Sequence, residues 1–148
     1  AASNFGQSAE LDVKKSTPSY SREAYLTFDL SSVDTITSAK LELFGGLEYA
    51  PDSPVQIAAY AVPTTTWTQS AITYANRPAT SSNPIAIVTL SDGAIKTYTW
   101  DLTAYLQSQK AAGHNVVSID LRALNSALPL AQFASTEAGA NAPALMIS

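Results

Sequence analysis

The sequence predicts an all-β protein, a jelly-roll-like antiparallel β-sandwich with one short helix. Four segments carry a hydrophobic residue at every second position, which is typical of strands that bury one face against a core, and five shorter candidate strands bring the total to nine. Turn-forming residues separate these segments, and only one stretch has helical spacing. The 148 residues suit a single domain, 1–148, because a chain of this length buries about 70% of its unfolded surface without staples. The chain has no cysteine, which excludes disulfide frameworks, thiolate metal sites and cysteine nucleophiles.

The first two expected strands are Glu10–Lys15 and Glu23–Leu30, adjacent and joined by a turn over Ser16–Ser21. In the second, Leu26 and Phe28 share one face while the residues between them point to the other. The same alternation occurs in Ala39–Phe44, Val55–Val62 and Val117–Arg122. The remaining shorter candidates are Ile85–Leu90, Thr97–Trp100, Ala131–Ala134 and Ala144–Ile147.

Glycine and proline mark the connections between these strands. Gly45-Gly46 is interpreted as a turn after the third strand, and Ala50–Pro54 as the loop that leads to the fourth. Two further loops are expected at Ser81–Pro84 and at Asp92-Gly93.

A single helix is expected after the sixth strand. Asp101 has the side chain of a helix cap, and Leu102, Tyr105 and Leu106 form an apolar stripe with three- and four-residue spacing. Gly113 has the conformational freedom to end the helix. A helix this short in a β-domain is expected to close one end of the sandwich.

The charge of the chain limits its partners. The formal net charge is -4 and only 14% of the residues are charged, against about 25% in ordinary globular proteins. An acidic chain lacks the basic face that nucleic-acid binding requires, so no nucleic-acid partner is expected. No apolar run approaches the roughly 18 residues of a membrane span, so no membrane insertion is expected. The Ser-, Thr-, Ala- and Asn-rich composition favours an extracellular protein.

The sequence gives little sign of catalysis. The single histidine, His114, lies between Gly113 and Asn115, and we interpret it as an exposed turn residue with no nucleophile nearby. Glycoside hydrolysis needs two facing carboxylates, and a lyase would use a tyrosine with an arginine or asparagine, but no spacing singles out either set. We therefore expect no enzyme, with a lyase or hydrolase as the third hypothesis. No cofactor is expected; calcium held by Asn4 and Asp12 stays open without a spacing argument.

Basic and aromatic residues gather near the N-terminus of this acidic chain. The group consists of Lys14, Lys15, Tyr20, Arg22 and Tyr25. If two antiparallel strands meet at the Ser16–Ser21 turn, Lys14 and Arg22 share one face with an aromatic ring. Such a face suits an acidic polysaccharide, because cations bind uronate carboxylates and a ring covers the apolar side of a sugar. The alternative is that the cations are solvated and Tyr25 packs between strands.

A second aromatic group contains Trp67 and Tyr74 and is followed by Arg77. The two rings suit a platform for sugars. They equally suit anchors that hold an irregular loop against the sandwich, with Arg77 bonding the carbonyl groups of the loop. We favour the structural interpretation, because large aromatics in loops of small β-domains usually bury their rings and bond their polar atoms.

A series of short motifs runs in order along nearly the whole chain. The motifs are Asn4–Gly6, Leu11–Lys14, Ser21–Leu30, Ile36–Leu41, Trp67 with Ile72–Tyr74 and Asn76–Pro78, Tyr98–Thr103, Phe133–Glu137 and Asn141–Leu145. This series resembles the DNRLRE-type domain family, and it is also similar to disaggregatase-related repeats. Each motif alone is weak, and the ordered series is the specific part.

The resemblance implies a jelly-roll-like sandwich of secreted bacterial and archaeal proteins. Related modules are attached to polysaccharide-degrading enzymes, alginate lyases among them, and bind carbohydrate there. In the alginate-binding members, surface Lys, Arg and Tyr residues hold the uronate chain. Carried over to this sequence, the implied ligand-binding residues are Lys14 and Arg22, with Tyr25, Lys15 and Tyr20 behind them.

The chain departs from the family pattern at its beginning. Members usually have a further strand before the Asn-aromatic-Gly motif, whereas only Ala1–Ser3 precede it here. A sandwich without its first strand exposes the backbone of a neighbour, expected to be Ala144–Ile147, and another copy of the chain suits that edge. The alternative to a binding module is therefore a structural or adhesive subunit of an extracellular fibre or surface layer that assembles by strand donation; a trimmed chain is the other explanation.

Overall fold

The computed structural model describes residues 10–17, 21–63, 71–73, 75–126, 129–135 and 138–148. This part of the chain forms nine strands and one helix, close to the expected elements. The strands are β1 (Glu10–Val13), β2 (Ala24–Asp29), β3 (Ala39–Leu47), β4 (Val55–Val62), β5 (Ala86–Leu90), β6 (Lys96–Asp101), β7 (Val116–Ala123), β8 (Ala131–Ala134) and β9 (Ala144–Ile147), and the helix is α1 (Thr103–Ala111).

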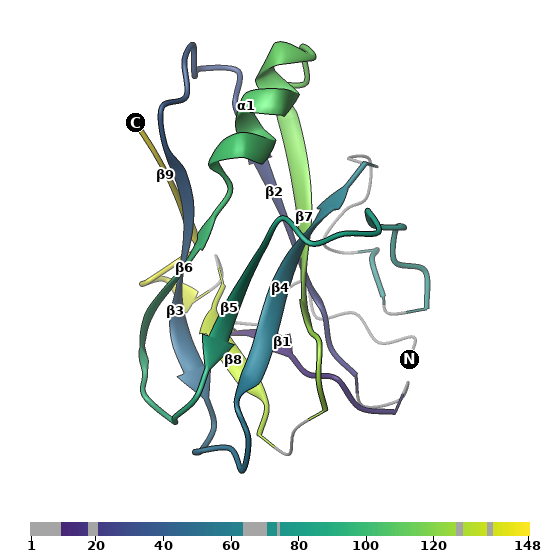
Figure 1. The fold of residues 1–148 in the computed structure, drawn as a ribbon, viewed down its shortest axis with the longest axis vertical. Coiled ribbons are helices and arrows are strands. Elements are labelled where there is room, and N and C mark those ends of the chain that lie inside the picture. Colours follow the sequence, from purple (N-terminus) through teal and green to yellow (C-terminus); the bar gives the residue numbers. More distant parts are fainter. Residues whose placement is uncertain (1–9, 18–20, 64–70, 74, 127–128, 136–137) are drawn as a thin grey trace.

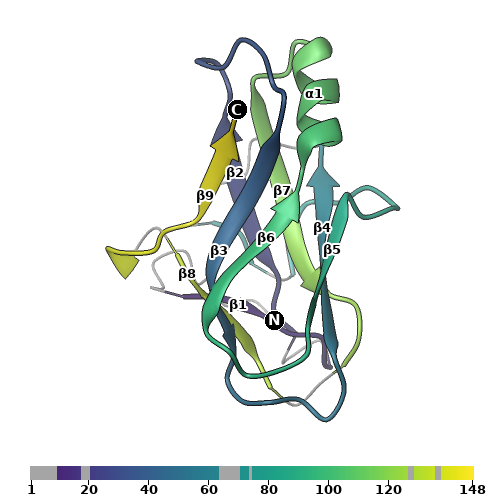
Figure 2. The ribbon, with the colours of Figure 1, turned by 60° about the vertical axis from the view of Figure 1, so that its left-hand side comes forward.

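The strands form two antiparallel sheets that face each other (Figures 1 and 2). One sheet has the order β2-β7-β4-β5; the other has the order β1-β8-β3-β6, with β9 also paired to β3. Successive antiparallel pairs lie in opposite sheets: β1 with β8 and β3 with β6 in the five-stranded sheet, and β2 with β7 and β4 with β5 in the four-stranded sheet. The chain is therefore folded back on itself and rolled up, which is the jelly-roll arrangement that the sequence predicts.

The core lies between the sheets and is centred on Trp100 of β6. Trp100 is fully buried, and its Nε1 donates a 3.0 Å hydrogen bond to the carbonyl of Ile57 on β4, in the opposite sheet. Phe133 of β8 meets the Trp100 ring edge to face, with centroids 5.9 Å apart. A buried indole N–H needs an acceptor, so this bond fixes the position of one sheet against the other.

The helix α1 covers one end of the sandwich (Figure 2). The expected cap at Asp101 is wrong by one residue, because Leu102 occupies the cap position. Asp101 just before it still accepts hydrogen bonds from the backbone N–H and the hydroxyl of Thr103, at 3.0 and 2.6 Å. Leu106 is buried, as the apolar stripe predicts. Gly113 has a φ of +79°, which confirms that the helix ends at a glycine.

The expected turn at Gly45-Gly46 is wrong, because both residues continue β3. Gly45 pairs with Lys96 on one side and with Phe133 on the other. Its φ is +154°, and a Cβ there would lie 2.0 Å from the carbonyl oxygen of Gln132. The glycine therefore serves the close approach of two strands, which a sequence pattern does not distinguish from a turn.

The expectation that each strand buries only one face is also wrong for two strands. β4 and β7 are buried on nearly every residue of both faces. Described residues of the connection between β4 and β5 lie over the outer face of their sheet: the Pro78 carbonyl accepts a hydrogen bond from the Tyr25 hydroxyl of β2, and the Thr80 hydroxyl accepts one from Arg122 of β7. This cover determines the surroundings of the polar side chains described below.

Replacing the central tryptophan tests how far the sandwich depends on it. We expect Trp100→Phe to lower the free energy of unfolding by about 2–4 kcal/mol, because it leaves the Ile57 carbonyl unpaired and opens a cavity. Urea denaturation measures the change. Tyr49→Phe is the control, since Tyr49 is 52% exposed and its loss of one hydroxyl should change little. A cost for Trp100→Phe below that of the control would contradict this role.

Candidate functional site

The Ser16–Ser21 turn is closed by the side chain of Ser21. The Ser21 hydroxyl accepts the backbone N–H of Ser16 at 2.9 Å and lies 2.8 Å from the Ser16 carbonyl. The Ser21 N–H donates to the carbonyl of Thr17. Ser21 is buried, so the turn is held from within rather than by solvent-exposed contacts.

The turn places Lys14 directly opposite Arg22. The two residues form an antiparallel bridge and exchange both backbone hydrogen bonds, at 3.0 and 2.8 Å. Residues directly opposite each other in such a pair direct their side chains to the same side. The prediction that Lys14 and Arg22 share a face is therefore confirmed at the level of the backbone.

The sequence predicts that the two strands flanking the turn are neighbours in one sheet, and this prediction is wrong. β1 pairs with β8 and β2 pairs with β7, in different sheets, so the Lys14–Arg22 bridge connects the edges of the two sheets. Lys15 is exposed and its Nζ donates a 2.9 Å hydrogen bond to the carbonyl of Leu124, beyond the end of β7. We refer to Lys14, Lys15 and Arg22 as the basic turn.

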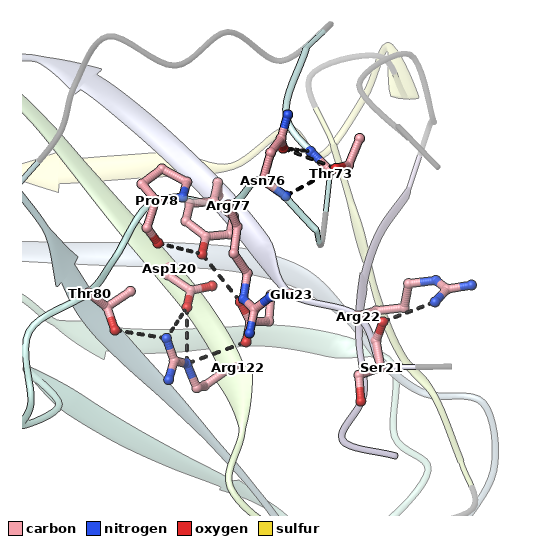
Figure 3. A network of polar contacts seen from close by, with 11 residues as sticks. Ser21, Arg22, Glu23, Thr73, Asn76, Arg77, Pro78, Thr80, Asp120 and Arg122 are labelled. Carbon is pink, nitrogen blue, oxygen red and sulfur yellow. Dashed lines mark hydrogen bonds and ion pairs between the residues drawn. The ribbon is translucent and has the colours of Figure 1, made fainter. Parts of the chain in front are cut away.

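Tyr25 lies apart from the basic turn. Its hydroxyl is 3.3 Å from the carboxylate of Glu23 and 3.3 Å from the carbonyl of Pro78, on the connection between β4 and β5. Figure 3 shows the side chain of Arg22 away from Glu23 and the arginines around it. The structure therefore brings Lys14 and Arg22 together and places Tyr25 in a different group of side chains.

That group is centred on Asp120 of β7. In the sheet register Asp120 lies between Tyr25 of β2 and Tyr60 of β4. Asp120 is fully buried, and its Oδ2 accepts hydrogen bonds from Arg122 Nε at 3.0 Å and Nη2 at 2.8 Å. Arg122 in turn stacks on the Tyr60 ring, with its guanidinium carbon 4.3 Å from the ring centroid.

Glu23 links the Asp120–Arg122 pair to the connection between β4 and β5. Its carboxylate lies between two guanidinium groups (Figure 3): Arg77 Nε is 3.1 Å from Oε2, and Arg122 Nε is 3.6 Å from Oε1. Arg122 also donates to the hydroxyl of Thr80 at 2.8 Å. We refer to Glu23, Arg77, Asp120 and Arg122 as the arginine–carboxylate cluster.

Burial changes the acidity of the cluster and of its neighbour. Removal from water, together with the negative charge of Glu23, raises the pKa of Asp120 to about 7. Burial and the charge of Asp120 also raise the pKa of the Tyr25 phenol. The neutral form of Asp120 is thus within reach of physiological pH, which an exposed aspartate never approaches.

The cluster cannot be recognised from the sequence, for a physical reason. Alternation along Val117–Arg122 places Asp120 and Arg122 on the face away from the core, and such residues are expected to be solvated. The connection that buries them comes from about 40 residues earlier in the chain. The signal that points to them is the pairing of the two opposite charges at positions two apart on one strand face.

A second acidic group lies on the five-stranded sheet. Asp12 faces Gln132 across β1 and β8, and burial together with the charge of Glu10 raises the pKa of Asp12. Gln132 donates to Glu10 at 2.8 Å. Among the described residues, no three His, Asp or Glu side chains gather closely enough to hold a metal ion. Asn4, the other expected calcium ligand, lies outside the described residues.

His114 is exposed after α1, as predicted, and its Nδ1 is 3.0 Å from Oε1 of Gln109. Arg77 pairs with the Glu23 carboxylate, a contact that the sequence does not predict. Tyr20, Trp67 and Tyr74 lie outside the described residues, so the choice between a sugar platform and loop anchors stays a prediction.

Comparison with known families assigns this jelly roll to a class. The model of carbohydrate-binding module family 96 matches residues 1–148. The chain belongs to this family. A comparison with curated proteins gives no match. Membership makes carbohydrate the partner of this module, in agreement with the class that the motif series implies; the DNRLRE-type assignment and the association with alginate lyases stay predictions. In the part of the chain that the structure describes, no helix is both long and apolar enough to span a membrane.

The raised pKa of Asp120 predicts how stability depends on pH. The folded protein binds this proton more tightly than the unfolded chain does, because an aspartate in the unfolded chain has the ordinary pKa of 3.8. The proton therefore contributes stability that is fully present below about pH 4 and is lost as the pH rises to about 7.

Asp120→Asn removes this dependence, because asparagine stays neutral at every pH. We expect the melting temperature of the variant to rise relative to wild type by at least about 3 °C between pH 4.5 and pH 8, the change that ~1 kcal/mol produces in a domain of this size. Scanning calorimetry measures both proteins. Asp34→Asn, at an exposed position, is the control. Parallel pH profiles for Asp120→Asn and wild type would contradict the assignment of the proton to Asp120.

Proposed function

We propose that this module is a non-catalytic, extracellular protein that binds an acidic, uronate-type polysaccharide. The single observation that carries the proposal is the Lys14–Arg22 bridge, which holds two cationic side chains on one side of the chain. Lys15 adds a third cation at the neighbouring position and is exposed. Cations fixed in pairs suit a polymer that carries one carboxylate on each sugar.

The rigidity of the basic turn supports a binding role. Two backbone hydrogen bonds fix Lys14 opposite Arg22, and the buried hydroxyl of Ser21 closes the turn between them. The Arg22 Nη1 donates to the carbonyl of Ser21 at 2.9 Å, which orients its guanidinium. A preoriented guanidinium loses less conformational entropy when it binds a carboxylate, so the ligand gains more from each contact. Tyr20 stays a proposed aromatic residue of this site, whereas Tyr25 contacts Glu23 and Pro78 in the separate arginine–carboxylate cluster.

The double variant Lys14→Ala/Arg22→Ala tests the site. We expect its dissociation constant for alginate or polygalacturonate to rise by tenfold or more, because each lost charge-assisted contact contributes about 1.5–3 kcal/mol. Affinity electrophoresis and titration calorimetry measure the change. Added salt should weaken binding of wild type more than of the variant, since screening acts on the same charges.

A charge-matched variant separates this site from general electrostatics. Lys40→Ala/Lys96→Ala removes two exposed cations from β3 and β6, away from the basic turn. We expect it to bind nearly as wild type does. Equal losses in both double variants would remove the basic turn from the proposal, and turnover of the polymer by the pure chain would overturn the non-catalytic assignment.

A specific observation favours a structural subunit as the second candidate. Ser38 and Ser148 exchange backbone hydrogen bonds at the end of β9. Because hydrogen-bonded pairs alternate along antiparallel strands, Met146 and Ala144 are the residues of β9 that bond to β3. Leu145 and Ile147 therefore direct their backbone groups to the other edge. Within the described residues, no strand pairs with that edge. An open edge of this kind accepts a strand from another copy of the chain.

Met146→Glu tests strand donation without disturbing the ladder to β3. Met146 is 54% exposed and lies opposite Lys40, which a glutamate would pair with. We expect the variant to stay monomeric at concentrations at which wild type forms filaments, because edge charges repel between copies. Negative-stain microscopy and light scattering measure assembly, with Ile95→Glu as the exposed control outside β9. A wild type that stays monomeric at high concentration would exclude this candidate.

A further inference from the structure

The net charge of the arginine–carboxylate cluster depends on whether Asp120 is protonated. With all four groups ionised, its two guanidinium groups and two carboxylates cancel. With Asp120 protonated, the cluster carries one positive charge. The acidic members are the buried ones: the side chain of Asp120 is fully buried and that of Glu23 is 10% exposed. The side chains of Arg77 and Arg122 are 34% and 31% exposed. The cluster thus turns its cations toward solvent and its anions inward.

The exposed side of Arg122 is suited to a further contact. Its Nε and Nη2 are bound to Asp120 and Thr80, so the guanidinium is fixed in direction. Among the described residues, no acceptor is bonded to its Nη1. Its flat face lies over the Tyr60 ring. A fixed guanidinium beside aromatic rings is the combination that binds a carboxylate on a sugar.

Asp120 holds one oxygen without a partner. Its Oδ2 takes both hydrogen bonds from Arg122, whereas Oδ1 is buried and has no hydrogen-bond partner within the described residues. A buried, ionised carboxylate oxygen without a donor is costly, and a proton removes that cost. The built geometry of the cluster therefore provides a place where a proton is taken up from solvent.

We infer that the exposed face of Arg77 and Arg122 is a second subsite for the carboxylate of a uronate sugar, and that Asp120 takes up a proton when the sugar binds. The inference rests on the proposed function and refines it. The bound carboxylate brings a negative charge next to Glu23 and Asp120, and protonation of Asp120 restores the balance. Affinity at this subsite is therefore highest when Asp120 is already neutral.

The direction of the pH effect follows from linkage. Because burial raises the pKa of Asp120 to about 7, the acid is neutral at pH 5.5 and largely ionised at pH 8. Uronate carboxylates keep their charge over this range. The groups around Asp120 come from four elements: Glu23 just before β2 and Tyr25 of β2, Arg122 of β7, Tyr60 of β4, and Arg77 and Thr80 of the connection between β4 and β5.

Binding of polygalacturonate at pH 5.5, 6.5 and 8.0, at constant ionic strength, tests the subsite. We expect the affinity of wild type to fall at least about threefold from pH 5.5 to pH 8.0. Asp120→Asn should keep the affinity of pH 5.5 throughout, because its side chain is neutral at every pH. Arg77→Gln should weaken binding at all three pH values. Calorimetry in two buffers of different ionisation enthalpy should show proton uptake near pH 7 for wild type and none for Asp120→Asn.

Two controls isolate the cluster. His114→Gln removes the single histidine of the sequence, which is exposed after α1, and should leave the pH profile unchanged. Lys14→Ala/Arg22→Ala should weaken binding but keep the fall between pH 5.5 and 8.0. Circular dichroism at each pH confirms that the variants are folded.

The outcomes separate the subsite from the function on which it rests. A folded wild type that binds polygalacturonate equally at all pH values, or an Asp120→Asn variant that keeps the pH dependence, overturns the proton-coupled subsite and leaves the basic turn in place. Normal binding by Arg77→Gln also overturns it. Absence of binding to uronate polymers at every pH overturns the proposed function and the subsite with it.

Discussion

The burial of the Asp120 carboxylate is the constraint that organises one face of this protein. A buried carboxylate destabilises the fold unless it is paired and hydrogen-bonded, and Asp120 is fully buried. Arg122 provides two hydrogen bonds to one of its oxygens, and Thr80 and Glu23 keep Arg122 in place. The Thr80 bond, together with the Arg77–Glu23 pair and the bond from Tyr25 to Pro78, also fastens the connection between β4 and β5 to the sheet. The polar cluster and the cover over it therefore depend on each other.

The jelly-roll topology brings together residues that the sequence separates widely. Glu23 precedes β2, Asp120 and Arg122 belong to β7, and Arg77 lies on the connection between β4 and β5. Pairing of β2, β7 and β4 in one sheet is what makes them neighbours. The other sheet is held in position by the bond from Trp100 to Ile57, and the Lys14–Arg22 bridge connects the edges of the two sheets. The basic turn is thus a joint of the sandwich as well as a group of cations.

The sequence is sufficient to predict the elements, because alternation and capping are local signals. All nine strands and the helix lie where these signals place them. Gly45 shows where a local signal fails: the same residue type serves a turn or a close approach of strands, and only the partner strand decides. Asp120 shows a failure at longer range, since its face looks solvated until the connection between β4 and β5 is placed over it. The Lys14–Arg22 pair was predictable because a short turn joins the two residues.

The two cationic surfaces of this acidic module differ in how their charge arises. The basic turn presents cationic side chains whose positions depend on backbone geometry, and we expect ionic strength to change its attraction for a polyanion. The arginine–carboxylate cluster has no net charge when all its groups are ionised, and only a proton on Asp120 makes it cationic. A chain with a net charge of -4 repels a polyanion over most of its surface, so binding requires cations concentrated at specific places. In the proton-coupled subsite that we propose, a buried acid controls one such surface, and we expect the module to hold an acidic polymer more tightly in acidic surroundings than in neutral ones.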